Sequence, residues 1–290
     1  MTRATHIGRI GAVLAASALA IVSGCGGSGG DPGAEAAPDP GPQHVHGLGI
    51  NPADGSLVVA THTGLFRMAA GSQRATRVGD RRQDTMGFAV VGPDRFIGSG
   101  HPDPRDQLPP SLGLIESSDA GRSWSSVSLL GETDFHTLRA ADAHVVGYDA
   151  SGGRLMLSAD RGQSWRTAPS PPAALVDLVV DPSDPTHLVA ASAAGLIASS
   201  DAGERWSRPG PLAVALAWPA RTALYALAPD GAVSASADGG DSWVRRGDLP
   251  GEPAALAATA ADSLIAALHD GRIVSSTDGG RSWSAGPWAR

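Results

Sequence analysis

The sequence contains no lysine, a single cysteine and few aromatic residues. Without lysine, the protein has no amine side chain that could form a Schiff base with a substrate. With one cysteine, the chain cannot close an internal disulfide. The formal net charge of −7 argues against the basic surface that nucleic acid phosphates require, so we expect no nucleic acid partner. The sequence also lacks a glycine-rich nucleotide-binding motif.

The apolar stretch near the amino terminus is too short to span a membrane comfortably. It covers 10–22 and follows two arginines, which is typical of a secretion signal. It runs into Val22-Ser23-Gly24-Cys25, which resembles the bacterial lipobox, in which the cysteine becomes the lipidated first residue of the mature chain. The resemblance implies a signal peptide at 1–24 and a lipoprotein held at the cell membrane, outside the cytoplasm, by Cys25. Residues 25–43 are rich in glycine and proline and are predicted to form a flexible tether before a domain at 44–290.

One eight-residue pattern, S-x-D-x-G-x-(S)-W, occurs five times, and we call each copy a corner octet. The copies are Ser117–Trp124, Ser158–Trp165, Ser199–Trp206, Ser236–Trp243 and Ser276–Trp283. They recur about every 40 residues, a period that indicates stacked supersecondary units. Within each octet we expect the aspartate to bind backbone N–H groups and the glycine to adopt a left-handed conformation. The tryptophan is expected to bury its ring against the neighbouring unit.

Short apolar strands, separated by glycine-containing turns, surround the octets. The segment from His44 to Arg290 holds six units of this length, and each unit reads as four short strands. The first unit has no octet; its sequence has diverged between Met68 and Arg77. These features predict an all-β, six-bladed β-propeller, with seven blades as the alternative. The predicted inner strands are 45–50, 86–91, 136–140, 175–180, 214–218 and 254–259.

The corner octet resembles the Asp-box of the Asp-box (BNR-repeat) β-propellers, a group that includes sialidases, xyloglucanases, sortilin-type receptors and a photosystem assembly factor. The segments HVHGLG, ATHTGL, MGF, GSGHP and DFH further resemble Asp-box lipoproteins that are labelled sialidase-like or glycosyl hydrolase. In such propellers the Asp-box is structural and lies away from the face that binds ligands. The resemblance therefore implies a fold and says little about the chemistry.

Histidines gather at one predicted rim of the ring, within the first three repeats. His46, Met86 and His136 align at the start of the inner strands, and His62 and His101 align at the end of the second strands. Imidazole nitrogens suit copper or zinc, and a thioether favours Cu(I). We therefore predict that these five residues form a metal site. The alternatives are a polar ligand that contains no metal, and histidines that only satisfy the fold.

Several other polar residues are predicted to overhang the same rim and to contact a ligand. They are His44, two residues before His46, Asp103 and Arg105 in a long insertion, and Glu132 in a loop between blades. The insertion contains four prolines between 102 and 110, so it could also be a preordered contact loop. A protein-recognition or assembly scaffold, expected to be a monomer, is thus an alternative function.

Glycoside hydrolysis is a further alternative, because it needs two carboxyl groups roughly 5–10 Å apart on one pocket. Asp84 and Asp134 occupy matching positions before inner strands and are the predicted catalytic pair. A standard sialidase would also need an arginine triad and a tyrosine nucleophile. The two tyrosines, Tyr148 and Tyr225, lie in predicted second strands with no matching glutamate nearby. We do not expect sialidase activity, and any hydrolase activity rests on likeness of fold.

Overall fold

The computed structural model describes residues 39, 41–72, 74–207 and 210–285. The predicted signal peptide, Cys25 and most of the predicted tether lie outside the described residues. The described chain falls almost entirely within one unit, Pro40–Arg290. Its regular secondary structure consists of β-strands, and no helix long and apolar enough to cross a membrane is found in this part of the chain.

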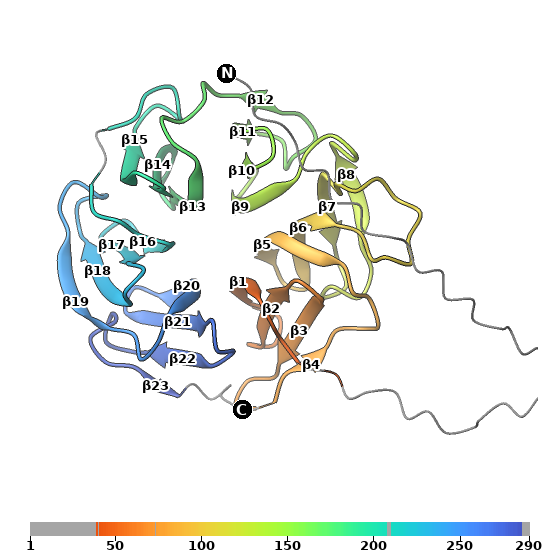
Figure 1. Cartoon of the computed structure of the whole chain (residues 1–290), viewed down its shortest axis with the longest axis horizontal. Coiled ribbons are helices and arrows are strands. Elements are labelled where there is room, and N and C mark those ends of the chain that lie inside the picture. The colour runs from red at the N-terminus through yellow and green to blue at the C-terminus, as the bar shows by residue number, and fades with distance from the viewer. Residues whose placement is uncertain (1–38, 40, 73, 208–209, 286–290) are drawn as a thin grey trace, which may run out of the picture. The chain divides into compact units, whose positions relative to one another are not determined.

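Six antiparallel sheets stand around a central axis (Figure 1), which confirms the predicted six-bladed propeller. The first three blades consist of β1 (Val45–Ile50), β2 (Leu57–Thr61), β3 (Gly64–Met68) and β4 (Thr76–Arg77); β5 (Asp84–Gly92), β6 (Arg95–His101), β7 (Leu114–Ser117) and β8 (Ser125–Ser128); and β9 (Phe135–Ala141), β10 (His144–Asp149), β11 (Arg154–Ser158) and β12 (Arg166–Thr167).

The last three blades follow the same order from the axis outward. They consist of β13 (Leu175–Asp181), β14 (Asp184–Ser192) and β15 (Gly195–Ser199); β16 (Ala215–Ala220), β17 (Ala223–Leu227), β18 (Ala232–Ser236) and β19 (Val244–Asp248); and β20 (Pro253–Ala260), β21 (Ser263–Leu268), β22 (Ile273–Ser276) and β23 (Ser284–Ala285). In the fourth blade, Ser207 and Gly210 donate backbone hydrogen bonds to β15, where the other blades have an outer strand.

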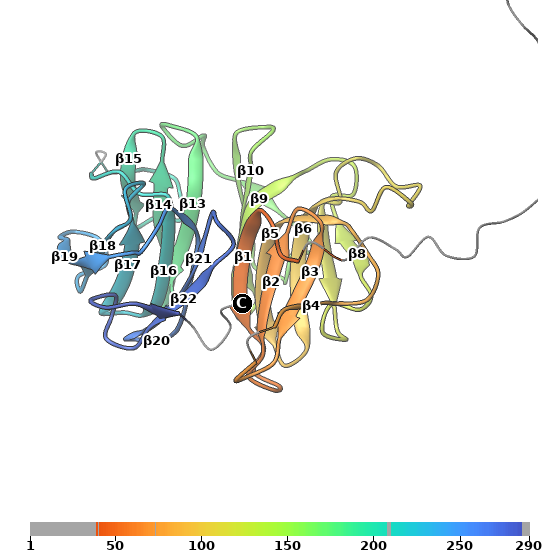
Figure 2. The same cartoon turned by 60° about the horizontal axis from the view of Figure 1, so that its bottom comes forward.

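The innermost strand of each blade contacts the innermost strand of the next blade. These strands are β1, β5, β9, β13, β16 and β20, and the ring closes where β20 meets β1 (Figure 2). The predicted inner strands match the observed ones to within a few residues, because each apolar segment is flanked by turn-forming residues. The inner strands therefore surround the central channel.

The hydrophobic core is divided into six clusters, each lying between two neighbouring blades. Five of them include the tryptophan of a corner octet, and each octet's tryptophan faces the preceding blade. The cluster between the sixth and first blades contains Phe66 and Met68, and no octet tryptophan is among its described members. This difference follows from the absence of an octet in the first blade, as the sequence predicts.

The side chains of the corner octet fold it into a compact turn. In the third blade, the Ser158 hydroxyl donates to Asp160 Oδ1 (2.7 Å) and accepts from the backbone N–H of Gly162 (2.8 Å). Asp160 also accepts from the backbone N–H and the hydroxyl of Ser164. The Asp160 pKa is consequently held well below its ordinary value, at about 2. The predicted backbone capture by the octet aspartate is thus confirmed here.

The octet glycine lies directly against the preceding blade. Gly162 has a φ of +82°, and a Cβ placed on it would lie 2.0 Å from Leu114 Cδ2 of β7. Leu114 is fully buried. The octet glycines of the other blades face Leu65, Leu155, Val189 and Val233 of the blade before them in the same way. The absence of a side chain at this position lets consecutive blades approach each other.

We expect Gly162→Ala to destabilise the fold by about 2–4 kcal/mol. About 1 kcal/mol reflects the left-handed conformation and the rest reflects the clash with Leu114. Gly153→Ala is the matched control, because Gly153 also has a positive φ, of +63°, but no atom lies within 4 Å of its added Cβ. Denaturant unfolding of both variants measures the difference. Equal loss of stability in the two would show that the contact between blades contributes nothing.

Candidate functional site

The register of the strands separates the two rims of the ring. In the second blade, Asp84 at the start of β5 pairs with His101 at the end of β6. At the other end of β6, Phe96 pairs with Ser117 of β7, the first residue of a corner octet. We call these edges the histidine rim and the octet rim. The expected placement of the histidines and the octets at opposite edges is therefore confirmed for this blade.

The residues that align at the start of the first three inner strands are extra residues of β-bulges. Met86 lies between two paired residues of β5 and has no partner of its own on β6. His46 of β1 and His136 of β9 hold the same position. A bulge turns the side chain out of the regular alternation of a strand. All three side chains line the central channel, although the sequence pattern gave no indication of the bulges.

Two histidines of the first blade meet an aspartate of the second, and we call these residues the first group. His62 Nδ1 lies 2.7 Å from Asp84 Oδ2, and His46 Nε2 lies 3.4 Å from Asp84 Oδ1. The Asp84 side chain is only 9 % exposed. His46 Nε2 and Asp84 Oδ1 are both buried, and their approach lacks hydrogen-bond geometry. One ligand atom from each of the three residues lies within 4.8 Å of the others, so the first group could hold a metal ion.

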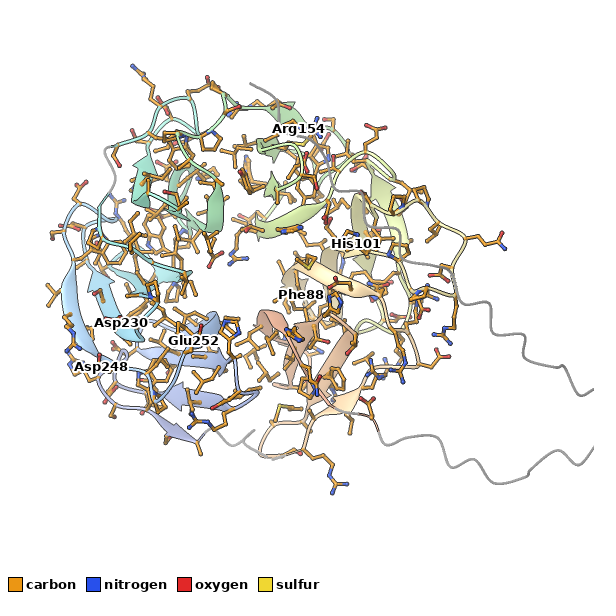
Figure 3. The ribbon with its side chains drawn as sticks, viewed as in Figure 1. Phe88, His101, Arg154, Asp230, Asp248 and Glu252 are labelled. Carbon is orange, nitrogen blue, oxygen red and sulfur yellow. The ribbon has the colours of Figure 1, made fainter. Side chains whose placement is uncertain are left out.

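The second group lies one blade further along and consists of His101, Asp134 and His136. His136 Nε2 lies 2.9 Å and His101 Nε2 lies 3.6 Å from the same oxygen, Asp134 Oδ2. The Asp134 side chain is 5 % exposed, and its Oδ1 atom has no hydrogen-bond partner. Figure 3 shows His101 on the side of the ring formed by the second and third blades. The predicted histidines are thus divided between two aspartates.

The surroundings of His136 favour its charged form. The hydrogen bond to Asp134 raises the pKa of His136 above its ordinary value, and partial burial opposes this effect. The negative charges of Asp134, Asp84 and Asp149 raise it further. The sequence analysis did not identify Asp149. It is the last residue of β10, the second strand of its blade, just as His101 is the last residue of β6. It is buried and bound by Arg154.

At the bulge positions, the channel behind the histidine rim carries polar side chains on one side only. It has a volume of about 630 Å³ and is lined by the inner strands of all six blades. At the position that His46, Met86 and His136 occupy, the remaining blades carry Val176, Val214 and Ala254. The predicted restriction of polar residues to the first three blades therefore holds at this level of the channel.

An ion pair further round the channel was missed by the sequence analysis. Arg139 donates to Asp177 Oδ1 (2.6 Å), and the backbone N–H groups of Leu178 and Leu216 also donate to that carboxylate. Burial raises the pKa of Asp177, and the Arg139 charge opposes the shift. The pair joins the inner strands of three blades. It could not be predicted, because the partners are far apart in sequence and meet only in the closed ring.

The other predicted ligand-binding residues have different surroundings. Asp103 is buried and accepts from Arg105 and from the backbone of Arg82, so these two predicted residues hold the insertion in place. Hydrogen bonding from Arg105 keeps the pKa of Asp103 well below its ordinary value. The exposed ring of His44 lies edge-on to His62, with ring centroids 6.2 Å apart. Glu132 is exposed, and its backbone carbonyl faces Arg154.

Comparison with solved structures supports the fold. The GH74 enzyme of Niastella koreensis has a TM-score of 0.61 at 14% identity, over 84% of this chain and 45% of the enzyme. The GH74 xyloglucanase of Xanthomonas campestris gives 0.57 at 18% identity, with the same coverage. YCF48 bound to D1 peptide gives 0.54 at 16% identity, over 84% and 81% of the two chains.

These similarities establish the propeller and no particular activity. The present chain spans less than half the length of the GH74 enzymes it resembles. No known protein family matches the sequence, and no curated protein sequence matches it.

In the metal-free protein, we expect the pKa of the His136 imidazole to lie above its ordinary value. Because the folded-state pKa is raised, the ion pair with Asp134 stabilises the fold below the ordinary imidazole pKa. This contribution is lost as the pH rises through the raised value. NMR titration in the presence of a chelator measures the pKa, and Asp134→Asn should lower it. A His136 pKa that does not respond to Asp134→Asn would contradict the assigned cause.

Proposed function

We propose that the protein is a metal-binding propeller that holds a transition metal ion in the first group, His46, His62 and Asp84. The observation that carries this proposal is the pair of buried atoms, His46 Nε2 and Asp84 Oδ1, that face each other at 3.4 Å without a hydrogen bond. Buried polar atoms without a partner are costly, and an ion between them would satisfy both.

The spacing of these atoms suits a small cation. Ligand atoms about 2.0–2.1 Å from a tetrahedral ion lie about 3.3–3.4 Å from each other. The observed separation of 3.4 Å falls at this value. His62 Nδ1, which now faces Asp84 Oδ2, would supply a third ligand when its proton is displaced. Three protein ligands leave a coordination position open to water or to a bound molecule.

The ligand set favours zinc or copper over calcium or magnesium. Two imidazole nitrogens and one carboxylate oxygen are typical of zinc and Cu(II), whereas magnesium and calcium prefer oxygen ligands alone. The arrangement of the rim supports the same choice, because imidazoles recur along it in the first three blades, whereas the equivalent bulge positions of the other blades carry Val176, Val214 and Ala254. A bound ion would therefore meet a ligand at the mouth of the channel.

Glycoside hydrolysis is the second candidate function. It is favoured by two buried carboxylates, Asp84 and Asp134, which begin or precede the inner strands of consecutive blades on the histidine rim. A hydrolase requires one of them to donate a proton to the leaving group. Each carboxylate is instead met by two imidazoles, which makes metal binding the stronger proposal.

The amino-terminal sequence supports a membrane-anchored location. We propose that the corner octets are Asp-boxes of a lipoprotein, that residues 1–24 are removed, and that lipid attached to Cys25 holds the propeller outside the cytoplasm. Multiple acyl chains hold a protein at a membrane stably, whereas a single chain does not. The tether before the first blade would let the histidine rim reach ligands in its surroundings.

We expect the purified protein to bind one zinc or Cu(II) ion in the first group. Since the loss of groups that merely support a ligand costs about 10–100-fold in affinity, His46→Ala or Asp84→Asn should weaken binding by more than about 100-fold. Isothermal titration and metal analysis after reconstitution measure the affinity and the stoichiometry. Binding should also weaken with acid, because the imidazoles must lose protons to act as ligands.

His144→Ala is the matched control for these variants. His144 is an exposed imidazole that pairs with Ala141 at the octet rim, so its loss should leave metal binding unchanged. The absence of any bound metal in the reconstituted wild-type protein would overturn the proposal. An equal loss of metal affinity in His144→Ala and in His46→Ala would also overturn it.

Cys25→Ser tests the membrane location. We expect this variant to move from the membrane fraction to the soluble fraction when cells of a lipoprotein-processing host are fractionated. The propeller residues are unchanged, so metal binding by the released protein should match that of the wild type. Continued recovery in the membrane fraction would refute the lipid anchor.

A further inference from the structure

The wall of the central channel carries a cation whose hydrogen-bonding capacity is only partly used. Arg139 of β9 lines the channel, and its side chain is 30 % exposed. Among the described residues, its guanidinium donates to the carbonyl of Leu138 and to Asp177 Oδ1. A guanidinium has more N–H donors than these two contacts use. Arg139 therefore keeps donors for a molecule that enters the channel.

An anion in the channel would meet no unmatched negative charge on its wall. Among the described residues that line the channel, Asp177 is the one acid. Its carboxylate accepts from Arg139 and from the backbone N–H groups of Leu178 and Leu216, so its charge is already compensated. The aspartates of the histidine rim are not lining residues, and each of them is met by imidazoles. The spare hydrogen-bonding capacity of the ion pair therefore consists of donors.

Asp177 itself shows how this wall holds a carboxylate. It binds one guanidinium and two backbone N–H groups, and one of these, from Leu216, belongs to the inner strand of the next blade. Each inner strand is the edge of its sheet, and an edge strand exposes backbone N–H groups. The planar fork of a guanidinium fits the two oxygens of a carboxylate. The donors left at Arg139 thus favour the same chemical group in a ligand.

Apolar side chains face the channel beside this ion pair. Val176 directly precedes Asp177, lines the channel and is 51 % exposed. It is not a member of the clusters between blades, and Val214 and Ala254 hold the equivalent positions of the next two blades. Removing this apolar surface from water would favour a ligand with an apolar body. The channel volume of about 630 Å³ is typical of small-molecule sites.

We infer that the channel binds a small organic carboxylate, whose charged end pairs with Arg139 and whose apolar body lies against Val176 and Val214. The ion pair with Asp177 then has a second role besides joining the blades. It holds the guanidinium in place before the ligand arrives, which reduces the conformational freedom lost on binding. The inference goes beyond the proposed metal binding, because none of these residues belongs to the first group.

The test uses three probes that share one apolar body. They are para-trifluoromethylbenzoate, the corresponding benzyl alcohol and the corresponding benzylamine. Each probe is titrated into the purified, metal-free protein and followed by fluorine NMR and by the Nε–H signal of Arg139. We expect the benzoate to bind at least about tenfold more tightly than the alcohol, because it alone forms charge-assisted hydrogen bonds with Arg139. Acetate, which lacks the apolar body, should bind at least about tenfold more weakly than the benzoate.

Two variants separate the charged end of the site from its apolar side. In Arg139→Gln/Asp177→Asn, two amides replace the ion pair and leave no buried charge alone, so the benzoate and the alcohol should bind equally. Val176→Ser should weaken both probes by a similar factor and keep their ratio. Val244→Ser is the matched control, because Val244 is a 63 % exposed valine of β19 that does not line the channel. It should leave both affinities unchanged.

Every other result counts against the carboxylate site. Equal binding of the alcohol and the benzoate by the wild type, tighter binding of the amine, or no binding of any probe would overturn it. A preference for the benzoate that survives in the double variant would show that Arg139 only joins the blades. An Arg139 signal that stays fixed at saturating benzoate would overturn the site without any mutation. Denaturant unfolding of the variants excludes loss of the fold as a cause. Because the protein is metal-free, none of these results depends on metal binding by the first group.

Discussion

The contact between an octet glycine and the preceding blade governs the arrangement of the whole ring. At Gly162 the backbone touches Leu114 of the blade before it, and no residue with a Cβ would leave room for that leucine. The Ser158 hydroxyl and the Asp160 carboxylate keep the turn closed, so the glycine is held in its left-handed conformation. Because the same contact recurs in five blades, each blade is placed as a rotated copy of the one before. At the junction of the sixth and first blades, Phe66 and Met68 fill the interface instead.

This rotation explains why each group of polar residues is shared between blades. Asp84 belongs to the second blade, yet the imidazoles that face it belong to the first. Asp134 in turn receives one histidine from the second blade and one from the third. No single blade contains a complete group, so the possible ligand sets exist only when neighbouring blades are docked. The stability of the octet contacts at one rim therefore supports the geometry at the other.

More of the fold than of the candidate site could be predicted from the sequence. The octets, the inner strands and the alignment of His46, Met86 and His136 follow from local patterns and from their period. The partners of those residues do not, because they depend on the bulges and on how closely two blades approach. Asp84 and Asp134 were predicted as a catalytic pair, and the contacts of each carboxylate with two imidazoles did not follow from the sequence. The pairing of Asp103 with Arg105 and the ion pair of Arg139 with Asp177 likewise depend on side-chain positions that no spacing encodes.

A propeller can vary its binding chemistry at the bulge positions without altering its core. The side chains of His46, Met86 and Val176 line the channel and are not among the members of the clusters between blades, so these three residues can occupy equivalent places on the same scaffold. Val176, Val214 and Ala254 of the later blades put apolar side chains at the level of the histidines. A charge at the histidine rim is therefore screened less than it would be in open water, and its attraction to Asp84 or Asp134 is stronger. The asymmetry of the channel would thus strengthen the attraction of a cation to the side on which Asp84 and Asp134 lie.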